Sequence, residues 1–188
     1  MSKILISGYY GFANAGDEAM LTAIIESLRQ VEKNVELTVL SGNPEDTAAK
    51  HQVCSVYRFN PLGIIRAMKD SELIISGGGS LLQDVTSKRS LLYYLSIIGL
   101  GKFFGKKVML FAQGIGPIRA KWARKLTSLV CNEADLITVR DSESAAELIE
   151  MGVKPEKITV TADSVLSLNP VTKECGQYPV SYTHLTLP

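Results

Sequence analysis

The stretch KILISGYYGFANAGDEAMLTAIIESLRQV, residues 3–31, decides the fold. It opens with a short apolar run rich in β-branched residues, Lys3–Ser7, which predicts a strand. A glycine-containing loop follows, and then Asp17–Val31 carries apolar residues at positions 19, 20, 23, 24 and 28. Apolar side chains at this spacing lie on one face of a helix. A strand, a loop and an amphipathic helix therefore follow one another here.

The same alternation continues along the chain. Asn43-Pro44-Glu45 opens a helix, with asparagine as the N-cap and proline at the first helical position, and Leu62–Met68 predicts another. Six further strands are predicted at Val35–Leu40, Val53–Val56, Leu73–Ser76, Lys107–Ala112, Leu136–Val139 and Ile158–Thr161. This alternation predicts an α/β, Rossmann-like domain over residues 1–175, with a parallel sheet covered by helices on both faces.

The composition narrows the class of protein. The chain has 188 residues, 20 basic and 19 acidic side chains, and 46% apolar residues, as in an ordinary globular domain. Disordered, collagen-like and disulfide-scaffold proteins are excluded, and a net charge of +1 predicts no nucleic-acid partner. Cys54, Cys131 and Cys175 show no metal-ligand spacing, so we expect reduced thiols in a cytoplasmic protein, without a metal or cofactor.

The last residues, 176–188, do not fit this pattern. They show no periodicity, and their ending SYTHLTLP resembles translated adapter sequence in genes assembled from environmental DNA. One interpretation is that the tail is not native and that the natural protein continues; the other is a genuine irregular C-terminus. We therefore leave the tail, including His184, out of the site analysis.

Two segments bear on membrane contact. The N-terminus enters the first strand without the apolar region of a signal peptide. Ser90–Gly101 is the most apolar stretch, but a membrane span needs about 20 residues. It is either a helix buried against the sheet or a helix that touches a membrane surface through its basic rim. That rim consists of Lys88, Arg89, Lys102, Lys106 and Lys107.

Candidate functional residues gather after the strands. In an open parallel sheet, ligands bind beyond the carboxyl ends of the strands, which share one edge. Five of the predicted loops at this edge carry glycine, amide or charged residues, which predicts a binding cleft there. These loops are 8–18, 77–84, 113–117, 140–142 and 162–164.

The first loop does not suit a dinucleotide. Its glycines fall at positions 8, 11 and 16 rather than in a GxGxxG pattern, and no carboxylate closes the second strand. Asp17 and Glu18 would repel a phosphate but could accept hydrogen bonds from sugar hydroxyls; alternatively, they only favour the helix dipole. Asn14 is either an N-cap or an amide that holds a hydroxyl.

The other loops suit an anion. Gly77–Gly79 can adopt positive φ and expose amides to a phosphate or carboxylate, or form only a tight turn. Arg140 presents a planar fork that fits such an anion, or makes a surface ion pair. Gly114 and Gly116 indicate turn geometry in the pocket wall, and Asp163 is a binding residue or a turn former.

Common catalytic motifs are absent from the sequence. It contains no P-loop, no HExxH and no G-x-S-x-G motif. His51 lies between a predicted helix and strand and is expected at the solvated surface, and Asp141 is expected to cap a helix. The residues therefore predict part of a cleft without the usual general acid or base.

The ordered motifs GYYGFANAGDEAML, SGGGSLLQD, AQGIGP, RDSESAAEL and TADSV resemble the N-terminal half of the polysaccharide pyruvyl transferase family, over about residues 3 to 170. The resemblance implies two Rossmann-like domains that face each other across a cleft, as in the glycosyltransferase B fold. It implies transfer of the enolpyruvyl group of phosphoenolpyruvate, as a ketal, onto two hydroxyls of a lipid-linked saccharide. The ketal would later anchor surface-layer proteins.

The resemblance also assigns roles to residues. Arg140 is expected at the donor, residues 14–18 at the acceptor with Asp17 taking part in catalysis, and Gly77–Gly79 in the cleft wall. The family's histidine and further arginines belong to a second domain that this chain lacks, so the general acid is expected there. The expected substrate-binding residues are Tyr10, Gly11, Asn14, Gly16, Asp17, Glu18, Gly77, Gly78, Gly79, Gln113, Gly114, Arg140 and Asp163.

The resemblance predicts a cytoplasmic enzyme, and contact with the inner face of the cell membrane stays open. Two alternatives remain open. A glycosyltransferase would use a sugar nucleotide and ignore phosphoenolpyruvate. A non-catalytic carbohydrate-binding domain would bind a saccharide without any second domain.

Overall fold

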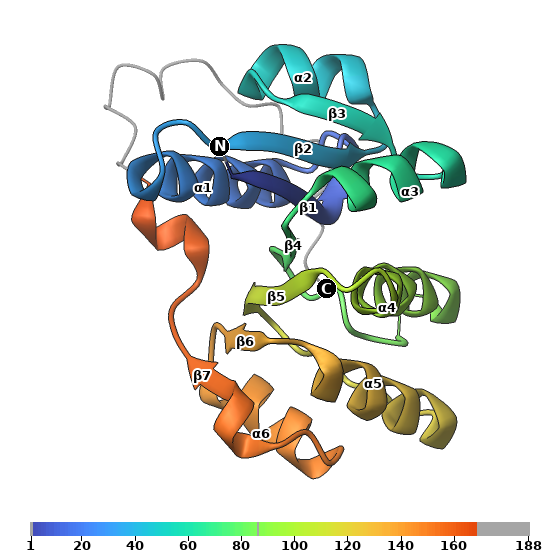
Figure 1. Ribbon diagram of the computed structural model, residues 1–188. Helices are drawn as coiled ribbons and strands as arrows, with labels where there is room; N and C mark the ends of the chain where they lie inside the picture. Colours follow the sequence, from blue (N-terminus) through green and yellow to red (C-terminus); the bar gives the residue numbers. More distant parts are fainter. Residues whose placement is uncertain (1, 86, 169–188) are drawn as a thin grey trace, which may run out of the picture.

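The computed structural model describes residues 2–85 and 87–168, and its centre is one parallel sheet (Figure 1). The sheet has seven strands in the order β3-β2-β1-β4-β5-β6-β7, each parallel to its neighbours. This confirms the predicted Rossmann-like α/β class. The strands are β1 (Lys3–Tyr10), β2 (Glu36–Ser41), β3 (Cys54–Tyr57), β4 (Leu73–Gly77), β5 (Lys107–Gln113), β6 (Leu136–Val139) and β7 (Ile158–Val160).

Helices cover both faces of the sheet. In Figure 1, α1 lies on the left of the sheet, and α3, α4 and α5 lie one below the other on the right. Asn43 caps α2 and Pro44 begins it, as the sequence predicts. The helices are α1 (Ala15–Val31), α2 (Pro44–His51), α3 (Pro61–Asp70), α4 (Lys88–Phe103), α5 (Lys121–Glu133) and α6 (Ser142–Glu150), with 3-10 turns η1 (Pro155–Lys157) and η2 (Ser164–Ser167).

The core consists of two apolar clusters, one on each side of the sheet. Ile6 of β1 packs with Ile24 of α1, whereas its neighbour Leu5 belongs to the other cluster with residues of α3, α4 and α5. Because successive strand residues point to opposite faces, β1 is buried on both sides. The central strands therefore form a rigid platform, and the loops at their carboxyl ends are the variable part.

Two strands bend where they reach the carboxyl edge. The pairing of β1 with β2 shifts register between Ser7 and Tyr10, and that of β5 with β6 shifts between Leu110 and Gln113. Ala112, inside the second irregularity, has a φ of 46°, a region that non-glycine residues rarely adopt. Bulges of this kind redirect side chains and recur beside functional sites.

The predicted exposure of His51 is wrong. His51 is buried, and its Nε2 lies 3.3 Å from Oε2 of Glu18. Arg29 donates to the His51 carbonyl at 3.1 Å, which further ties the end of α2 to α1. The sequence places His51 in a connection between a helix and a strand, whereas it is the last residue of α2. Its burial against Glu18 of α1 depends on how these two helices pack, which the sequence pattern does not give.

The apolar stretch Ser90–Gly101 forms most of α4, which buries Leu91, Leu95 and Ile98 against the sheet, so the predicted packing against the sheet is confirmed. The other side of the helix is exposed, and it carries Leu92 and Leu100. Among the described residues, no helix is long and apolar enough to cross a membrane. The tail 176–188, with His184, lies outside the described residues, as does Cys175.

Two glycines of α4 provide a matched test of this packing. A Cβ at Gly101 would lie 2.7 Å from Cδ1 of Ile74 and 3.0 Å from Cγ2 of Val108, whereas a Cβ at Gly99 meets nothing within 4 Å. We expect Gly99→Ala to stabilise the fold by about 0.5–1 kcal/mol, because alanine favours the helix. Gly101→Ala should destabilise it by about 1–3 kcal/mol through overpacking. Urea denaturation measures both; equal effects would contradict this placement of α4.

Candidate functional site

A pocket of about 400 Å³ opens at the carboxyl ends of β1 and β4. Its walls come from the β1–α1 loop, the segment after β4 and the start of α4, and they combine hydroxyl, amide, carboxylate and aromatic groups. The predicted residues Asn14 and Asp17 both line it. The lining residues are Tyr9, Asn14, Asp17, Ser80, Leu81, Gln83, Ser87, Ser90 and Tyr94.

Asp17 places an uncommitted carboxylate in this pocket. Oδ1 of Asn14 accepts from the amides of Gly16 at 3.0 Å and Asp17 at 3.4 Å, so Asn14 caps α1 and fixes Asp17 in its first turn. Burial raises the pKa of the Asp17 carboxyl, and the neighbouring charge of Glu18 raises it further. Among the described residues, its side chain makes no hydrogen bond or ion pair. It is therefore free to accept a hydrogen bond or a proton from a ligand.

The glycine turn after β4 packs closely against α1. Gly78 and Gly79 have φ values of 81° and 71°, which favour glycine. A Cβ at Gly79 would lie 3.1 Å from Oδ1 of Asp17, and the Gly79 amide donates to the sulfur of Met20. Because that amide is already used, the turn serves as a wall of the pocket beside Asp17, and its geometry favours the tight-turn interpretation of Gly77–Gly79.

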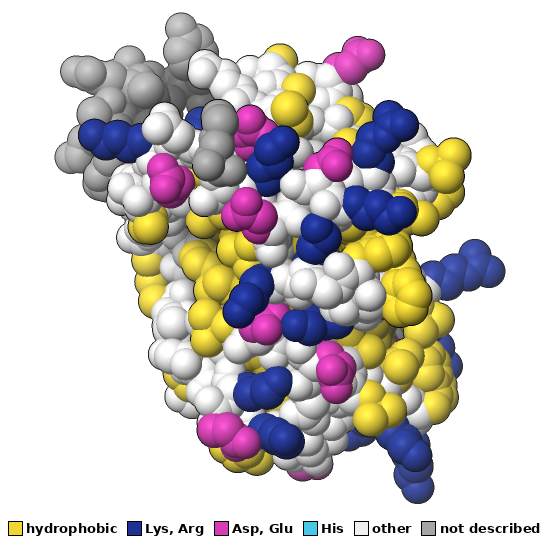
Figure 2. All heavy atoms as spheres, in the orientation of Figure 1, with side chains coloured by type: hydrophobic (Ala, Val, Ile, Leu, Met, Phe, Trp, Pro, Cys, Tyr) yellow, Lys and Arg dark blue, Asp and Glu magenta, His cyan; other side chains and the backbone are white. Residues whose placement is uncertain are grey.

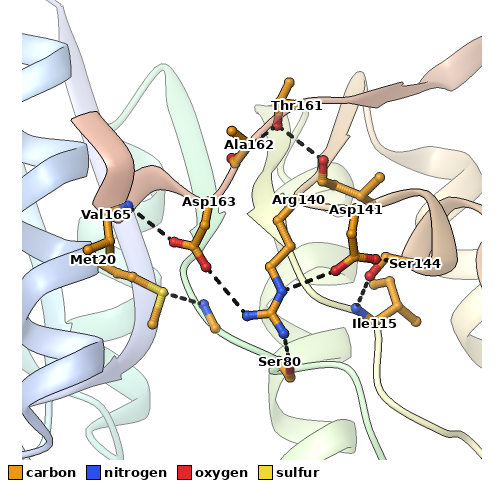
Figure 3. Close-up of polar contacts among 12 residues, drawn as sticks. Met20, Ser80, Ile115, Arg140, Asp141, Ser144, Thr161, Ala162, Asp163 and Val165 are labelled. Carbon is orange, nitrogen blue, oxygen red and sulfur yellow. Dashed lines mark hydrogen bonds and ion pairs between the residues drawn. The ribbon is translucent and has the colours of Figure 1, made fainter. Parts of the chain in front are cut away.

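Arg140 follows β6 and meets three loops at the same edge (Figure 3). Its Nε donates to Asp141 at 3.3 Å, its Nη1 to Asp163 at 3.5 Å and its Nη2 to Ser80 at 3.3 Å. The side chain is 35% exposed, so part of the fork stays open to solvent. Ser80 also lines the pocket, and it therefore connects Arg140 to the pocket that holds Asp17.

The neighbours of Arg140 hold its orientation. Asp141 caps α6, and hydrogen bonds from Ser144, reinforced by Arg140, keep the pKa of the Asp141 carboxyl below its usual range. Asp163 accepts from the Val165 amide at 3.1 Å and thereby caps η2. A Cβ at Gly114 would lie 2.7 Å from the guanidinium carbon, so only glycine lets the arginine lie across this strand end.

Tyr10 and Gln113 are buried beneath the site rather than exposed in it. The Tyr10 hydroxyl donates to the carbonyl of Gly77, and burial raises the pKa of this hydroxyl. Nε2 of Gln113 lies 3.1 Å from the hydroxyl of Ser76, and its Oε1 has no partner among the described residues. Both side chains brace the edge from below.

Glu18 is directed away from the pocket. Its Oε1 accepts from the Gly11 amide at 2.8 Å, and its Oε2 lies 3.3 Å from His51 and 3.7 Å from Lys50. Gly16 is exposed in the first turn of α1. The structure thus brings Asn14 and Asp17 together with the glycine turn, and Gly114 and Asp163 together with Arg140, whereas Glu18 and Gly11 form a separate network behind the loop.

Arg58 was not predicted from the sequence as a site residue. It directly follows β3 at the same edge, a position comparable to that of Arg140, and this position is the signal that could have identified it. Arg58 is 4% exposed, has no carboxylate within ion-pair distance among the described residues, and lies among aromatic rings. Its Nη2 is 3.3 Å from the Tyr94 hydroxyl. The rings are those of Tyr9, Phe12, Phe59, Tyr93 and Tyr94, with centroids 4.4–5.8 Å from the guanidinium carbon.

Ser80, Gln83, Tyr9 and Tyr94 were also missed as pocket residues. Ser80 and Gln83 stand within the predicted loop, but which of its side chains face the pocket depends on the turn. Within residues 2–85 and 87–168, no group of three or more His, Cys, Asp or Glu side chains is arranged to hold a metal ion.

The sequence matches the family model "Polysaccharide pyruvyl transferase" over residues 14–182. The chain belongs to the polysaccharide pyruvyl transferase family. The match begins at Asn14, in the loop that lines the pocket, and includes Arg140, Asp141 and Asp163. No curated protein matched the sequence.

Solved structures share the fold of this pyruvyl transferase family member at low sequence identity. HepE from Anabaena, in complex with UDP and glucose, is 14% identical with a TM-score of 0.60, over 87% of this chain and 44% of HepE. The UDP-GlcNAc 2-epimerase of Neisseria meningitidis is 15% identical with a TM-score of 0.53, over 88% and 47%. S. aureus MnaA is 16% identical with a TM-score of 0.52, over 87% and 46%. The chain thus spans less than half the length of these proteins.

The two adjacent carboxylates of α1 should behave differently. Both stand in its first turn, so both lose a similar interaction with the helix dipole when replaced. Glu18→Ala also leaves the Gly11 amide and His51 without their partner, and we expect it to cost about 1–3 kcal/mol more stability than Asp17→Ala. Thermal or urea denaturation of the two variants measures the difference. Equal losses would show that the Glu18 network contributes nothing.

Proposed function

We propose that this chain forms the N-terminal part of an enzyme that transfers the pyruvyl group of phosphoenolpyruvate, as a ketal, onto two hydroxyls of a polysaccharide precursor. The observation that carries the proposal is the proximity of two unlike groups. Arg140, a partly exposed arginine fork, adjoins a pocket through Ser80, and this pocket contains Asp17, a carboxylate that has no partner among the described residues. Family membership supports the same reaction class.

The reaction needs a group for each substrate. A proton adds to the methylene carbon of phosphoenolpyruvate, C2 becomes electrophilic, and one sugar oxygen bonds to C2 with loss of its proton. The C2–O bond to phosphate then breaks, phosphate leaves, and the second sugar oxygen bonds to C2 with loss of its proton. Arg140 would bind the donor carboxylate or phosphate through paired hydrogen bonds. The general acid is assigned to a second domain.

Asp17 would act on the acceptor. A carboxylate accepts hydrogen bonds from sugar hydroxyls. Burial in the pocket raises the pKa of the Asp17 carboxyl, which makes its carboxylate a stronger base toward a hydroxyl proton. Asn14 offers an amide beside it, and Tyr9, which is 41% exposed, offers ring surface for a sugar. Gly77–Gly79 would keep the pocket wall narrow at Asp17. Glu18, Gly11, Gly16, Tyr10 and Gln113 would support the loops that carry these groups.

The domain organisation belongs to the proposal. Residues 1–175 would form one Rossmann-like half of a glycosyltransferase-B-like enzyme, with the donor and acceptor meeting across a cleft. This division is supported by the solved structures, because the chain covers less than half of the length of each of them. Residues 176–188 would be foreign to the natural chain. The acceptor would be a lipid-linked saccharide at the inner face of the membrane, and the ketal would anchor surface-layer proteins.

A sugar-nucleotide-dependent glycosyltransferase is the second candidate, because the HepE and MnaA structures are complexes with UDP. One assay separates the two. The complete gene product is incubated with an N-acetylmannosamine-containing saccharide and either phosphoenolpyruvate or UDP-glucose. The proposal expects release of phosphate and a product heavier by pyruvate less one water. Turnover of UDP-glucose alone would overturn it, and saccharide binding without either reaction would favour a binding domain.

Replacement of Arg140 should affect the donor. We expect Arg140→Ala to lower kcat/KM for phosphoenolpyruvate by about a hundredfold, equivalent to about 2–3 kcal/mol of charged hydrogen bonding. Arg140→Lys keeps the charge but loses the planar fork, so its kcat/KM should lie between that of the unaltered enzyme and that of Arg140→Ala. Arg119→Ala, at an exposed arginine of the same edge, serves as the control. Unchanged kinetics in Arg140→Ala would remove Arg140 from the donor site.

Replacement of Asp17 should affect the acceptor. Asp17→Asn keeps the size of the side chain but loses its charge and cannot accept a proton. We expect it to raise the KM for the saccharide by about tenfold or more, as for the loss of one charged hydrogen bond, and to lower kcat. Steady-state kinetics with each substrate varied in turn measures this. A change confined to the KM for phosphoenolpyruvate would contradict the assignment.

A further inference from the structure

The outer surface formed by α3, α4 and α5 carries most of the protein's positive charge. Residues 58–70, 87–107 and 119–133, which contain these helices and their flanks, hold twelve of the 20 Lys and Arg residues. Of these twelve, Arg58 is buried, Lys102 pairs with Asp135, and Arg124 pairs with Glu147 and Glu150. The same ranges hold two of the 19 Asp and Glu residues, Asp70 and Glu133. The rest of the chain is therefore strongly acidic, although the net charge is only +1. We call this surface the basic face.

The basic face also exposes large apolar side chains on each of its helices. Leu62 of α3 is 79% exposed, Phe103 of α4 is 81% exposed, and Trp122 of α5 is 47% exposed. Each helix buries its opposite side in the same core cluster, so these side chains point away from the sheet. The other exposed apolar side chains of this face are Phe59, Leu92, Leu100 and Leu129.

Basic and apolar side chains alternate along this surface. In Figure 2, the right-hand edge, over α3, α4 and α5, shows yellow patches with dark blue side chains projecting between them, whereas magenta side chains gather farther left. Between α3 and α4 lies an apolar hollow of about 310 Å³, lined by Phe59, Ile64, Ile65, Ile97 and Leu100 among others. The exposed basic residues of the face are Arg66, Lys69, Lys88, Arg89, Lys107, Arg119, Lys121 and Lys125.

We infer that the basic face binds the surface of an anionic lipid bilayer. Lysine and arginine are attracted to anionic headgroups, and apolar side chains between them can enter the boundary between headgroups and acyl chains. The near absence of carboxylates across three helices gives the charge complementarity that such a surface requires. A half-exposed tryptophan such as Trp122 is also typical of a membrane interface.

The basic face adjoins the candidate site. Ser87 and Ser90, at the start of α4, line the pocket that contains Asp17, and Lys88 and Arg89 lie between them. Binding to a bilayer through α4 would therefore hold the pocket close to the headgroups. This link between the bilayer and the pocket rests on the proposed function, because it would bring a lipid-linked saccharide to Asp17. The binding of the basic face to lipid does not depend on the proposed function.

Flotation with lipid vesicles tests the inference on the 188-residue chain without any substrate. We expect the chain to float with vesicles of phosphatidylcholine containing about one third phosphatidylglycerol, and not with phosphatidylcholine alone. About 0.5 M NaCl should release most of it, because salt screens the charges. The double variant Leu62→Ser/Phe103→Ser and the double variant Lys69→Glu/Lys125→Glu should each lower the bound fraction at least tenfold.

Matched controls come from the other side of the molecule. Val31 is 88% exposed at the end of α1, and Lys33 is exposed just after it. Val31→Ser and Lys33→Glu should therefore bind vesicles like the unaltered chain, and circular dichroism should show all variants folded. Equal binding of all variants, equal binding to both vesicle types, or no binding would overturn the inference. So would a stable dimer in light scattering that Leu62→Ser/Phe103→Ser abolishes, since a second copy would then cover this face.

The outcome is separable from that of the proposed function. Turnover with a short water-soluble saccharide depends on the pocket and not on the basic face. Vesicle binding without such turnover would contradict only the proposed reaction. Turnover without vesicle binding would contradict only the proposed binding of the basic face to a bilayer.

Discussion

The hydrogen bond from the Tyr10 hydroxyl to the carbonyl of Gly77 joins the ends of β1 and β4, and the candidate site depends on this junction. The strand order reverses between these two strands, since β2 lies on one side of β1 and β5 on the far side of β4. Connections leave such a point in opposite directions, so the chain opens a crevice there. The bond from Tyr10 fixes the end of β4 beside β1, and Gly78 and Gly79, which follow β4 directly, pack against Met20 and Asp17 of α1.

The fold was predictable because it follows from local patterns. All seven strands were placed to within three residues at either end, since each is an apolar run between helical periodicities. The ends were less accurate at β1, which runs on to Tyr10, because a bulge with an exposed Tyr9 interrupts the pattern. The carboxyl ends of parallel strands lie at the same edge of a sheet, and this rule correctly placed Asn14, Asp17 and Arg140 at one edge.

The orientation of individual side chains was not predictable. Asp17 and Glu18 are adjacent in the sequence, yet one faces the pocket and the other faces α2, because helical neighbours differ by about 100° around the axis. His51 and Lys50 meet Glu18 from an element that periodicity cannot place relative to α1. Arg58 was missed for the same reason: its environment consists of rings from three separate segments, which only the folded chain brings together.

Arg58 also joins the candidate pocket to the basic face. Tyr9 and Tyr94 line the pocket and pack around its guanidinium, while Phe59, on the other side of the same cation, is 60% exposed beside the hollow between α3 and α4. A buried cation without a carboxylate is stable only if its neighbours stay in place, because the ring faces, the Tyr94 hydroxyl and the Gly8 carbonyl compensate for its lost water. Those neighbours belong to the β1–α1 loop, the start of α3 and the middle of α4. A shift of α3 or α4 must therefore disturb the packing of Tyr9 and Tyr94 at the pocket. The basic face, which we propose binds a bilayer, and the candidate pocket thus meet in one aromatic cluster around Arg58.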